Sequence, residues 1–208
     1  MTRTAYDRMS RWYDLLAVRA EWRCVQAGLQ ELATGEGEAA LEVGVGPGRA
    51  LVALARQVGA SGRAYGVDLS LQMCHIAQSR SAAAGLAWAQ VLCGDAAHLP
   101  FPSGCFDTVF MSFTLELFDQ AGIPAVLSEC RRVLRPNGRL GVVAMFRPEK
   151  VGLMLRLYEW LHKKLPNWVD CRPINPKQAL ADAGFAVLSA RNMALWGLPV
   201  AVVVARRK

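Results

Sequence analysis

The sequence predicts an α/β fold in which helices cover both faces of a mostly parallel β-sheet. Short, continuously apolar runs alternate with longer segments of helical periodicity, and this alternation is typical of a parallel sheet buried on both sides. The 208 residues suffice for one domain with a full core, and 53% of them are hydrophobic. Only 20% are charged, so the composition is that of a globular chain.

Five apolar runs are the clearest strands, with three helical segments between them. The strands are expected at Ala39–Val43, Ala64–Val67, Trp88–Leu92, Thr108–Phe113 and Leu140–Met145. The helices are expected at about residues 49–58, 70–84 and 121–134. The last helix must end before Arg135-Pro136-Asn137-Gly138, because proline and the turn residues that follow it interrupt a helix.

The two ends of the chain differ from this regular part, although residues 1–208 are expected to form a single domain. Residues 1–34 are expected to form a helical cap before the first strand. An insertion is expected at 147–172, with an amphipathic helix at Val151–Leu165. Asn175 and Pro176 occupy the N-cap and first positions of a short helix that ends before Gly184. Two last runs, Phe185–Ser189 and Val200–Ala205, are joined by a loop that a hairpin could use.

The net charge of +7 comes entirely from the last third of the chain. Residues 1–144 hold 13 Lys+Arg and 13 Asp+Glu, whereas residues 145–208 hold 11 and 4. No nucleic-acid-binding motif accompanies the excess, so a nucleic-acid partner is not expected. No apolar run reaches the length of a membrane span, and the charged N-terminus lacks a signal-peptide core, so we expect a cytoplasmic protein. The six cysteines form no C-x-x-C pair, and no metal site is expected.

The strongest chemical signal is the segment Leu41–Gly48, a glycine-rich turn between an apolar strand and a helix. Glycines there let a nucleotide approach the backbone closely, although such a turn can also serve packing alone. The glycines follow G-x-G-x-G rather than the G-x-G-x-x-G of dinucleotide folds, and Glu42 lies two residues before the first. A carboxylate repels a pyrophosphate but suits a cationic sulfonium or ammonium group. The sequence therefore favours S-adenosylmethionine (SAM) over NAD.

Acidic residues also follow the next two predicted strands. Asp68 is placed to accept hydrogen bonds from both ribose hydroxyls. Its alternative role is to cap the helix at 70–84, a role for which Ser70 competes. Asp95 is placed to accept a hydrogen bond from an adenine amine. Acids at three successive strand ends indicate a nucleotide site of the Rossmann type.

These motifs resemble, in order along residues 6–146, those of the class I SAM-dependent methyltransferases. The matching segments are Tyr6–Asp14, Glu42–Gly48, Gly66–Ser70, Gly94–Phe101, Phe106–Val109 and Val133–Leu140. The two Tyr-Asp pairs of the first segment are similar to the opening of the ubiquinone/menaquinone-biosynthesis group. The resemblance implies a Rossmann-like three-layer sandwich with a seven-stranded sheet of order 3-2-1-4-5-7-6, in which strand 7 is antiparallel.

The resemblance also implies roles for individual residues toward SAM. Glycines 44, 46 and 48 would pack against its methionine and ribose parts, and Glu42 would face the methionine ammonium group. Asp68 would hold the ribose. Near the adenine and the transferred methyl group, the residues implied are Leu69, Asp95, Ala96, Ser112 and Phe113.

Methyl transfer from a sulfonium depends mainly on positioning, and a base is needed only if the acceptor must lose a proton early. The candidate bases are Tyr13, Glu116, His75 and His162, of which Glu116 could equally be a solvated loop charge and His75 a helix-surface residue. No catalytic residue is assigned from the sequence, and no oligomeric state is predicted.

The acceptor is expected to be a small molecule or a lipid-like compound such as a quinone or a phospholipid. The cofactor motif at Glu42 and Gly44–Gly48 is compatible with two functions. One is a methyltransferase, whose product would be S-adenosylhomocysteine, and the other is a non-catalytic regulatory protein that binds SAM. An NAD-dependent oxidoreductase is disfavoured by the glycine spacing. The apolar face of Val151–Leu165, with Lys163 and Lys164 nearby, could contact an anionic membrane surface or cap the protein's own sheet.

Overall fold

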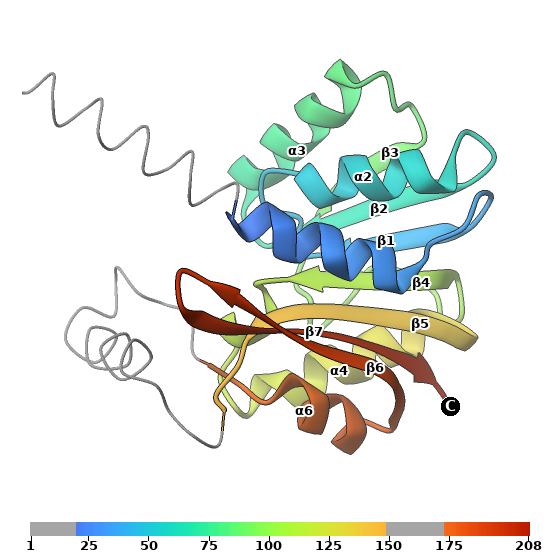
Figure 1. The fold of residues 1–208 in the computed structure, drawn as a ribbon. Helices are drawn as coiled ribbons and strands as arrows, with labels where there is room; N and C mark the ends of the chain where they lie inside the picture. Colours follow the sequence, from blue (N-terminus) through green and yellow to red (C-terminus); the bar gives the residue numbers. More distant parts are fainter. Residues whose placement is uncertain (1–19, 149–172) are drawn as a thin grey trace, which may run out of the picture.

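The computed structural model describes residues 20–148 and 173–208 and contains a seven-stranded β-sheet (Figure 1). The strands are β1 (Ala39–Val43), β2 (Arg63–Asp68), β3 (Ala89–Cys93), β4 (Phe106–Ser112), β5 (Leu134–Met145), β6 (Phe185–Leu195) and β7 (Leu198–Arg207). Their order is β3-β2-β1-β4-β5-β7-β6. β7 pairs antiparallel with both neighbours and all other pairs are parallel. The predicted fold class, strand order and direction of β7 are confirmed.

Helices cover both faces of this sheet. They are α2 (Arg49–Val58), α3 (Leu71–Ala83), α4 (Gly122–Val133), α6 (Pro176–Asp182) and the short 3₁₀ helix η1 (Leu115–Leu117). Residues 20–32 are also helical and lie with α2 and α3 on one face, whereas α4 and α6 lie on the other (Figure 1). Side chains of β5 alternate between the two cores, since Val143 packs in the first and Val142 in the second. The result is a three-layer sandwich.

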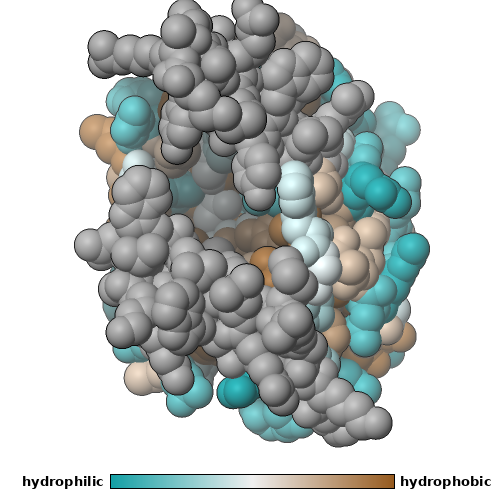
Figure 2. Space-filling model, turned by 60° about the vertical axis from the view of Figure 1, so that its left-hand side comes forward, coloured by the Kyte–Doolittle hydropathy of each residue, from teal (hydrophilic) through white to brown (hydrophobic). Residues whose placement is uncertain are grey.

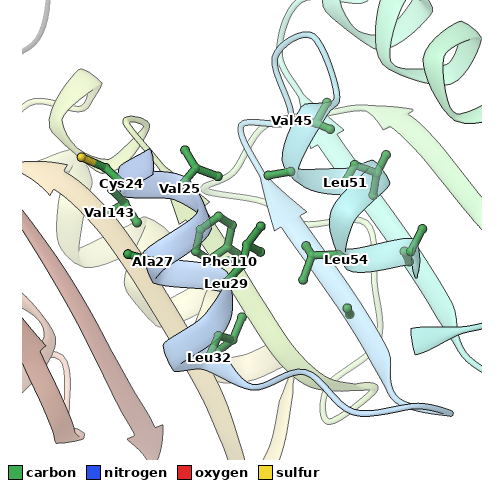
Figure 3. Packing of buried hydrophobic residues seen from close by; sticks show 14 of the residues in the cluster. Cys24, Val25, Ala27, Leu29, Leu32, Val45, Leu51, Leu54, Phe110 and Val143 are labelled. Atoms are coloured by element: carbon green, nitrogen blue, oxygen red, sulfur yellow. The ribbon is translucent and has the colours of Figure 1, made fainter. Parts of the chain in front are cut away.

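The helix at 20–32 packs closely on the middle of the sheet. A Cβ atom added to Gly28 would lie 2.5 Å from Val143 Cγ2 and 3.0 Å from Phe110 Cε2, so only glycine permits this approach. Leu29 and Leu32, both buried, extend the same contact along the helix (Figure 3). This helix is the described part of the predicted cap at 1–34. Residues 1–19, most of the insertion at 147–172 and the whole Val151–Leu165 helix lie outside the described residues.

The elements after residue 133 differ most from the sequence prediction. β5 begins at Leu134 rather than Leu140, because Leu134 already pairs with Phe106 before the Pro-Asn-Gly segment forms a bulge. The hairpin that the sequence allowed between β6 and β7 is confirmed, but its strands are longer than the predicted runs Phe185–Ser189 and Val200–Ala205. Both strands extend to a two-residue turn at Trp196 (φ 57°) and Gly197 (φ 78°), the conformation that favours tight hairpins.

The short helix α6 begins as predicted, because the Asn175 side chain accepts a hydrogen bond of 3.1 Å from the Gln178 backbone N–H. Within residues 20–148 and 173–208, no helix is long and apolar enough to cross a membrane.

Candidate cofactor site

A cavity of about 580 Å³ opens at the carboxyl ends of β1 to β4. Figure 2 shows this side of the molecule, where both hydrophilic and hydrophobic residues are visible inside a hollow of the surface. Eight of the nine predicted cofactor-binding residues line the cavity: Glu42, Gly44, Gly46, Asp68, Leu69, Asp95, Ala96 and Ser112. The fold thus brings together residues that are up to 70 positions apart in the sequence, from Glu42 to Ser112.

The three glycines of the loop after β1 have different structural roles. All have positive φ angles, 74° at Gly44, 48° at Gly46 and 78° at Gly48. A Cβ atom at Gly44 would lie 2.3 Å from Thr114 Cγ2, whereas one at Gly46 would meet no atom of residues 20–148 or 173–208 within 4 Å. A Cβ atom at Gly48 would lie 2.7 Å from the Ala77 Cα atom of α3. Gly48 is buried and packs α2 against α3, and it is not among the cavity-lining residues. Its contact with the cofactor stays a prediction.

Glu42 presents a buried carboxylate to this cavity. Glu42 lies on β1 and is only 2% exposed. Its Oε2 atom has no hydrogen-bond partner among the described residues. Burial raises the pKa of Glu42 well above 4.5, and the nearby Asp68 raises it further, while a hydrogen bond from the Leu51 backbone opposes both. An unpaired buried carboxyl group is costly unless a ligand supplies a donor or a cation. Glu42 therefore fits a ligand with an ammonium group.

Asp68 connects the glycine loop to the start of α3. Its Oδ2 atom accepts a hydrogen bond of 2.8 Å from the Gly46 backbone N–H, and its Oδ1 atom accepts one of 2.9 Å from Ser70. Ser70, not Asp68, caps α3, because its hydroxyl accepts a hydrogen bond from Met73 N–H at 3.4 Å. Each carboxylate oxygen can accept a second hydrogen bond, so Asp68 can still receive a pair of hydroxyl groups.

Asp95 and Leu69 lie at the more exposed end of the cavity. Asp95 accepts a hydrogen bond of 2.9 Å from the Ala97 backbone N–H and lies 3.2 Å from His98 Nδ1. The Ala97 hydrogen bond and then the His98 interaction hold the pKa of Asp95 below its ordinary value, so the carboxylate is ionised near neutral pH. Leu69 is 79% exposed at the end of β2. An ionised acceptor beside an exposed apolar side chain suits a flat, amine-bearing base.

The opposite end of the cavity is formed where β4 ends. Phe113 has φ 50°, an uncommon angle for a residue with a side chain, and its N–H donates to the Val143 carbonyl at 2.7 Å. The Thr114 hydroxyl donates to the Ser112 carbonyl at 3.0 Å. Ser112, Phe113 and Thr114 all line the cavity, so this turn fixes its wall beside β5.

Of the four candidate bases, the structure describes Glu116 and His75. His75 is exposed on α3, which confirms the interpretation as a surface residue. Glu116 is fully buried in η1 and accepts a hydrogen bond of 3.1 Å from the Met145 N–H, so its interpretation as a solvated loop charge is wrong. Glu116 is not among the cavity-lining residues. Tyr13 and His162 lie outside the described residues.

Burial raises the pKa of Glu116 to about 7, from an ordinary value of 4.5. Between these values the folded chain holds a proton that the unfolded chain has released. The resulting stabilisation is fully present below pH 4.5 and is lost as the pH rises through about 7. We expect this loss to reach about 3 kcal/mol of unfolding free energy at most.

Glu116→Gln keeps an acceptor for the Met145 N–H but cannot ionise. We therefore expect the variant to gain stability relative to the wild type between pH 5 and pH 8. Urea unfolding of both proteins at the two pH values measures this difference. The same stability difference at both values would contradict the expected titration.

Several cavity residues carry no signal that the sequence analysis used. The helix at 20–32 contributes Trp22 and Val25, and two arginines, Arg49 and Arg80, add positive charge. Arg49 follows the glycine loop directly, and this position could have suggested it. It also lies close enough to Glu21 to oppose the rise in that residue's pKa caused by burial. The cavity thus offers cations for a carboxylate as well as acids for an ammonium group and hydroxyls.

A sheet of this order, with a glycine loop after its first strand and acids after its first three, defines the class I SAM-dependent methyltransferase fold. The sequence comparison agrees, because residues 40–138 match a family model described as a methyltransferase domain. Residues 40–138 therefore form a methyltransferase domain, and the chain is similar to the SAM-dependent methyltransferases of the ubiquinone/menaquinone-biosynthesis group.

Individual relatives support this assignment. The chain is 35% identical over 144 residues to nocamycin O-methyltransferase from Saccharothrix syringae, covering 69% of this chain and 50% of the relative. It is 33% identical over 164 residues to demethylmenaquinone methyltransferase from Lactobacillus johnsonii, covering 78% and 65%. The chain thus spans between half and two thirds of the length of these relatives.

A solved SAM-dependent methyltransferase from Aquifex aeolicus shares the fold. Its TM-score is 0.67 at 23% identity, and the match covers 88% of this chain and 89% of that one.

Proposed function

We propose that this protein transfers a methyl group from SAM to a small-molecule acceptor and releases S-adenosylhomocysteine. The observation that carries the proposal is the buried carboxylate of Glu42, whose Oε2 atom has no partner among the described residues and which lines the same cavity as Asp68. A zwitterionic amino acid joined to a nucleoside matches this arrangement, because it supplies an ammonium group and ribose hydroxyls at once.

The cavity residues divide into those for the nucleoside and those for the amino acid. Asp68 would accept the ribose hydroxyls, while Asp95 and Leu69 would hold the base. Glu42 would pair with the ammonium group and Arg49 with the carboxylate. When bound, SAM supplies an electrophilic methyl group on a cationic sulfur.

The protein's own contribution to the reaction is to orient the ligand and exclude water. Trp22, Val25 and Phe113 give the cavity apolar walls, which strengthen the electrostatic interactions inside it. The wall at Ser112–Thr114 would separate the cofactor from the acceptor. No described side chain is required as an acid, because the sulfur leaves as a neutral thioether.

The cofactor can be identified by calorimetry. We expect SAM and S-adenosylhomocysteine to bind with one-to-one stoichiometry and NAD not to bind, because the buried Glu42 suits the ammonium group of SAM and the glycine loop lacks the G-x-G-x-x-G spacing of dinucleotide sites. The opposite order of affinities would favour an NAD-dependent oxidoreductase and would contradict the proposal. A SAM-binding regulatory protein would bind SAM but never convert it to S-adenosylhomocysteine in the presence of any acceptor.

We further infer that the acceptor is an apolar, quinone-type compound, with a phospholipid as the alternative lipid-like class. The support is the 33% identity to a demethylmenaquinone methyltransferase. The 35% identity to nocamycin O-methyltransferase supports another small-molecule acceptor equally well. Formation of S-adenosylhomocysteine with a demethylated naphthoquinone, but not with phosphatidylethanolamine, would support the first class.

A lipid-like acceptor would bring the protein to a membrane surface, and the basic insertion is the proposed contact. We expect the protein to co-sediment with anionic vesicles at low salt, because each Lys or Arg near such a surface contributes about 1 kcal/mol. Replacing Lys163 and Lys164 by glutamate should release it while SAM binding is retained. Wild-type protein that stays in the supernatant would exclude this contact.

A further inference from the structure

Two cysteine side chains lie beside the cofactor cavity and contact the backbone carbonyl groups of the consecutive residues Asp68 and Leu69. Cys93 ends β3 and pairs in register with Asp68 of β2, and Cys74 lies in the first turns of α3. The Cys74 thiol lies 3.5 Å from the Asp68 carbonyl oxygen, and the Cys93 thiol lies 3.5 Å from that of Leu69. The Cys74 thiol also lies 3.4 Å from the carbonyl oxygen of Leu92, the residue that precedes Cys93.

The two thiols differ in their access to solvent. Cys93 is exposed, whereas Cys74 is only 6% exposed. Burial, followed by the nearby Cys93 and Asp68, raises the pKa of the Cys74 thiol, so Cys74 remains protonated near neutral pH. A dissolved oxidant can reach Cys93 first, and Cys74 is then the adjacent partner. An exposed thiol beside a second thiol is the arrangement in which oxidation leads to a disulfide.

We propose that Cys74 and Cys93 form a reversible disulfide that lowers the affinity of the protein for SAM, an inference that rests on the proposed function. With hydrogen peroxide as oxidant, the Cys93 sulfur attacks one peroxide oxygen, the O–O bond breaks, and a sulfenic acid and one water form. The Cys74 sulfur then attacks the Cys93 sulfur, its proton leaves with the sulfenic hydroxyl as a second water, and the S–S bond forms. Two thiols lose two electrons, and one peroxide is reduced to two waters.

We expect the disulfide to act on the cavity through the backbone of Asp68 and Leu69. In the reduced protein, Cys74 donates to the Asp68 carbonyl and Cys93 to that of Leu69. Oxidation removes both donors and brings the sulfurs to about 2.0 Å with a fixed dihedral angle, which pulls α3 toward β3. The Asp68 carboxylate also accepts a hydrogen bond from the Gly46 N–H, so a movement of Asp68 would shift the glycine loop as well.

The experiment uses the reduced 208-residue protein treated with a small excess of hydrogen peroxide. We expect two free thiols to disappear, and mass spectrometry of non-reduced peptides to identify a Cys74–Cys93 cross-link. Calorimetry should show SAM binding weakened by about tenfold or more, with full recovery after dithiothreitol. Cys93→Ser should abolish both effects. The matched control is Cys105→Ser, which removes a partly exposed thiol elsewhere and should leave both effects intact.

The results distinguish a failure of the disulfide proposal from a failure of the proposed methyltransferase function. If the untreated, reduced protein does not bind SAM, the proposed function is contradicted. The cross-link can still be mapped in that case, because its detection needs no cofactor. If peroxide leaves Cys74 and Cys93 unlinked, or links Cys93 to a second molecule, the disulfide is excluded. A Cys74–Cys93 cross-link with unchanged SAM affinity would exclude its effect on the cavity.

Discussion

Asp68→Ala is expected to weaken SAM binding by roughly 1–3 kcal/mol, or about 5- to 150-fold. The carboxylate would lose its hydrogen bonds to the ribose hydroxyls, which are strong because the acceptor is charged. The variant also loses the hydrogen bond of 2.8 Å that holds the Gly46 N–H, so the glycine loop is less well positioned before the ligand arrives. Both effects act in the same direction. Calorimetric titration of folded wild-type and variant protein measures their sum.

Ser70→Ala is the matched control for this substitution. It removes the N-cap of α3 but leaves the Asp68 carboxylate and its bond to Gly46 in place. We expect it to cost about 1 kcal/mol of stability while SAM affinity stays within a factor of about two. If the folded Asp68→Ala variant binds SAM with unchanged affinity, Asp68 has only a structural role in the loop.

The regular part of the fold could be predicted because local signals coincide there. β1 was predicted to the residue, at Ala39–Val43, and so was α2, because the glycine loop marks the boundary between them. The hairpin of β6 and β7 could not be predicted in full. The segment containing Arg191 and Asn192 is polar, since β6 is an edge strand, and it therefore has no apolar alternation that would identify a strand.

In the site too, residues marked by the local sequence could be predicted, whereas residues placed by distant contacts could not. Asp68 and Asp95 could be predicted because each directly follows a parallel strand, and strand ends of this kind meet at one edge. Glu116 could not, because its burial depends on Met145, 29 residues away, and no pattern around Leu115 and Leu117 indicates it. Trp22 reaches the cavity from a helix that carries no motif at all.

The three glycines of the motif also depend on distant contacts. The sequence presents Gly44, Gly46 and Gly48 as equivalent members of one motif, and all three do adopt positive φ angles. Their neighbours differ, however, because α3 returns to the loop at Ala77 and η1 begins beside it after Thr114. Which glycine faces a ligand is decided by these tertiary contacts and not by the motif.

Gly44→Ala and Gly46→Ala are therefore expected to have different effects. The new methyl group at Gly44 would lie 2.3 Å from both Thr114 Cγ2 and Oγ1, at φ 74°. We expect a loss of about 2–5 kcal/mol of unfolding free energy from overpacking and backbone strain together. The methyl group at Gly46 meets no atom of the described residues within 4 Å, so only about 1–2 kcal/mol of strain is expected. It would instead occupy cavity space and weaken SAM binding by about tenfold or more.

Denaturant unfolding and calorimetry on both variants measure the two effects separately. Thr114→Ala introduced into Gly44→Ala removes the two closest atoms but leaves Thr114 Cβ, which would lie 2.9 Å from the new methyl group. We therefore expect the double variant to recover part of the lost stability, giving a coupling energy of about 1 kcal/mol or more. Equal stability losses in the two single variants, without such coupling, would mean that Gly44 does not make the close contact with Thr114. The distinction between a packing glycine and a ligand-facing glycine depends on that contact.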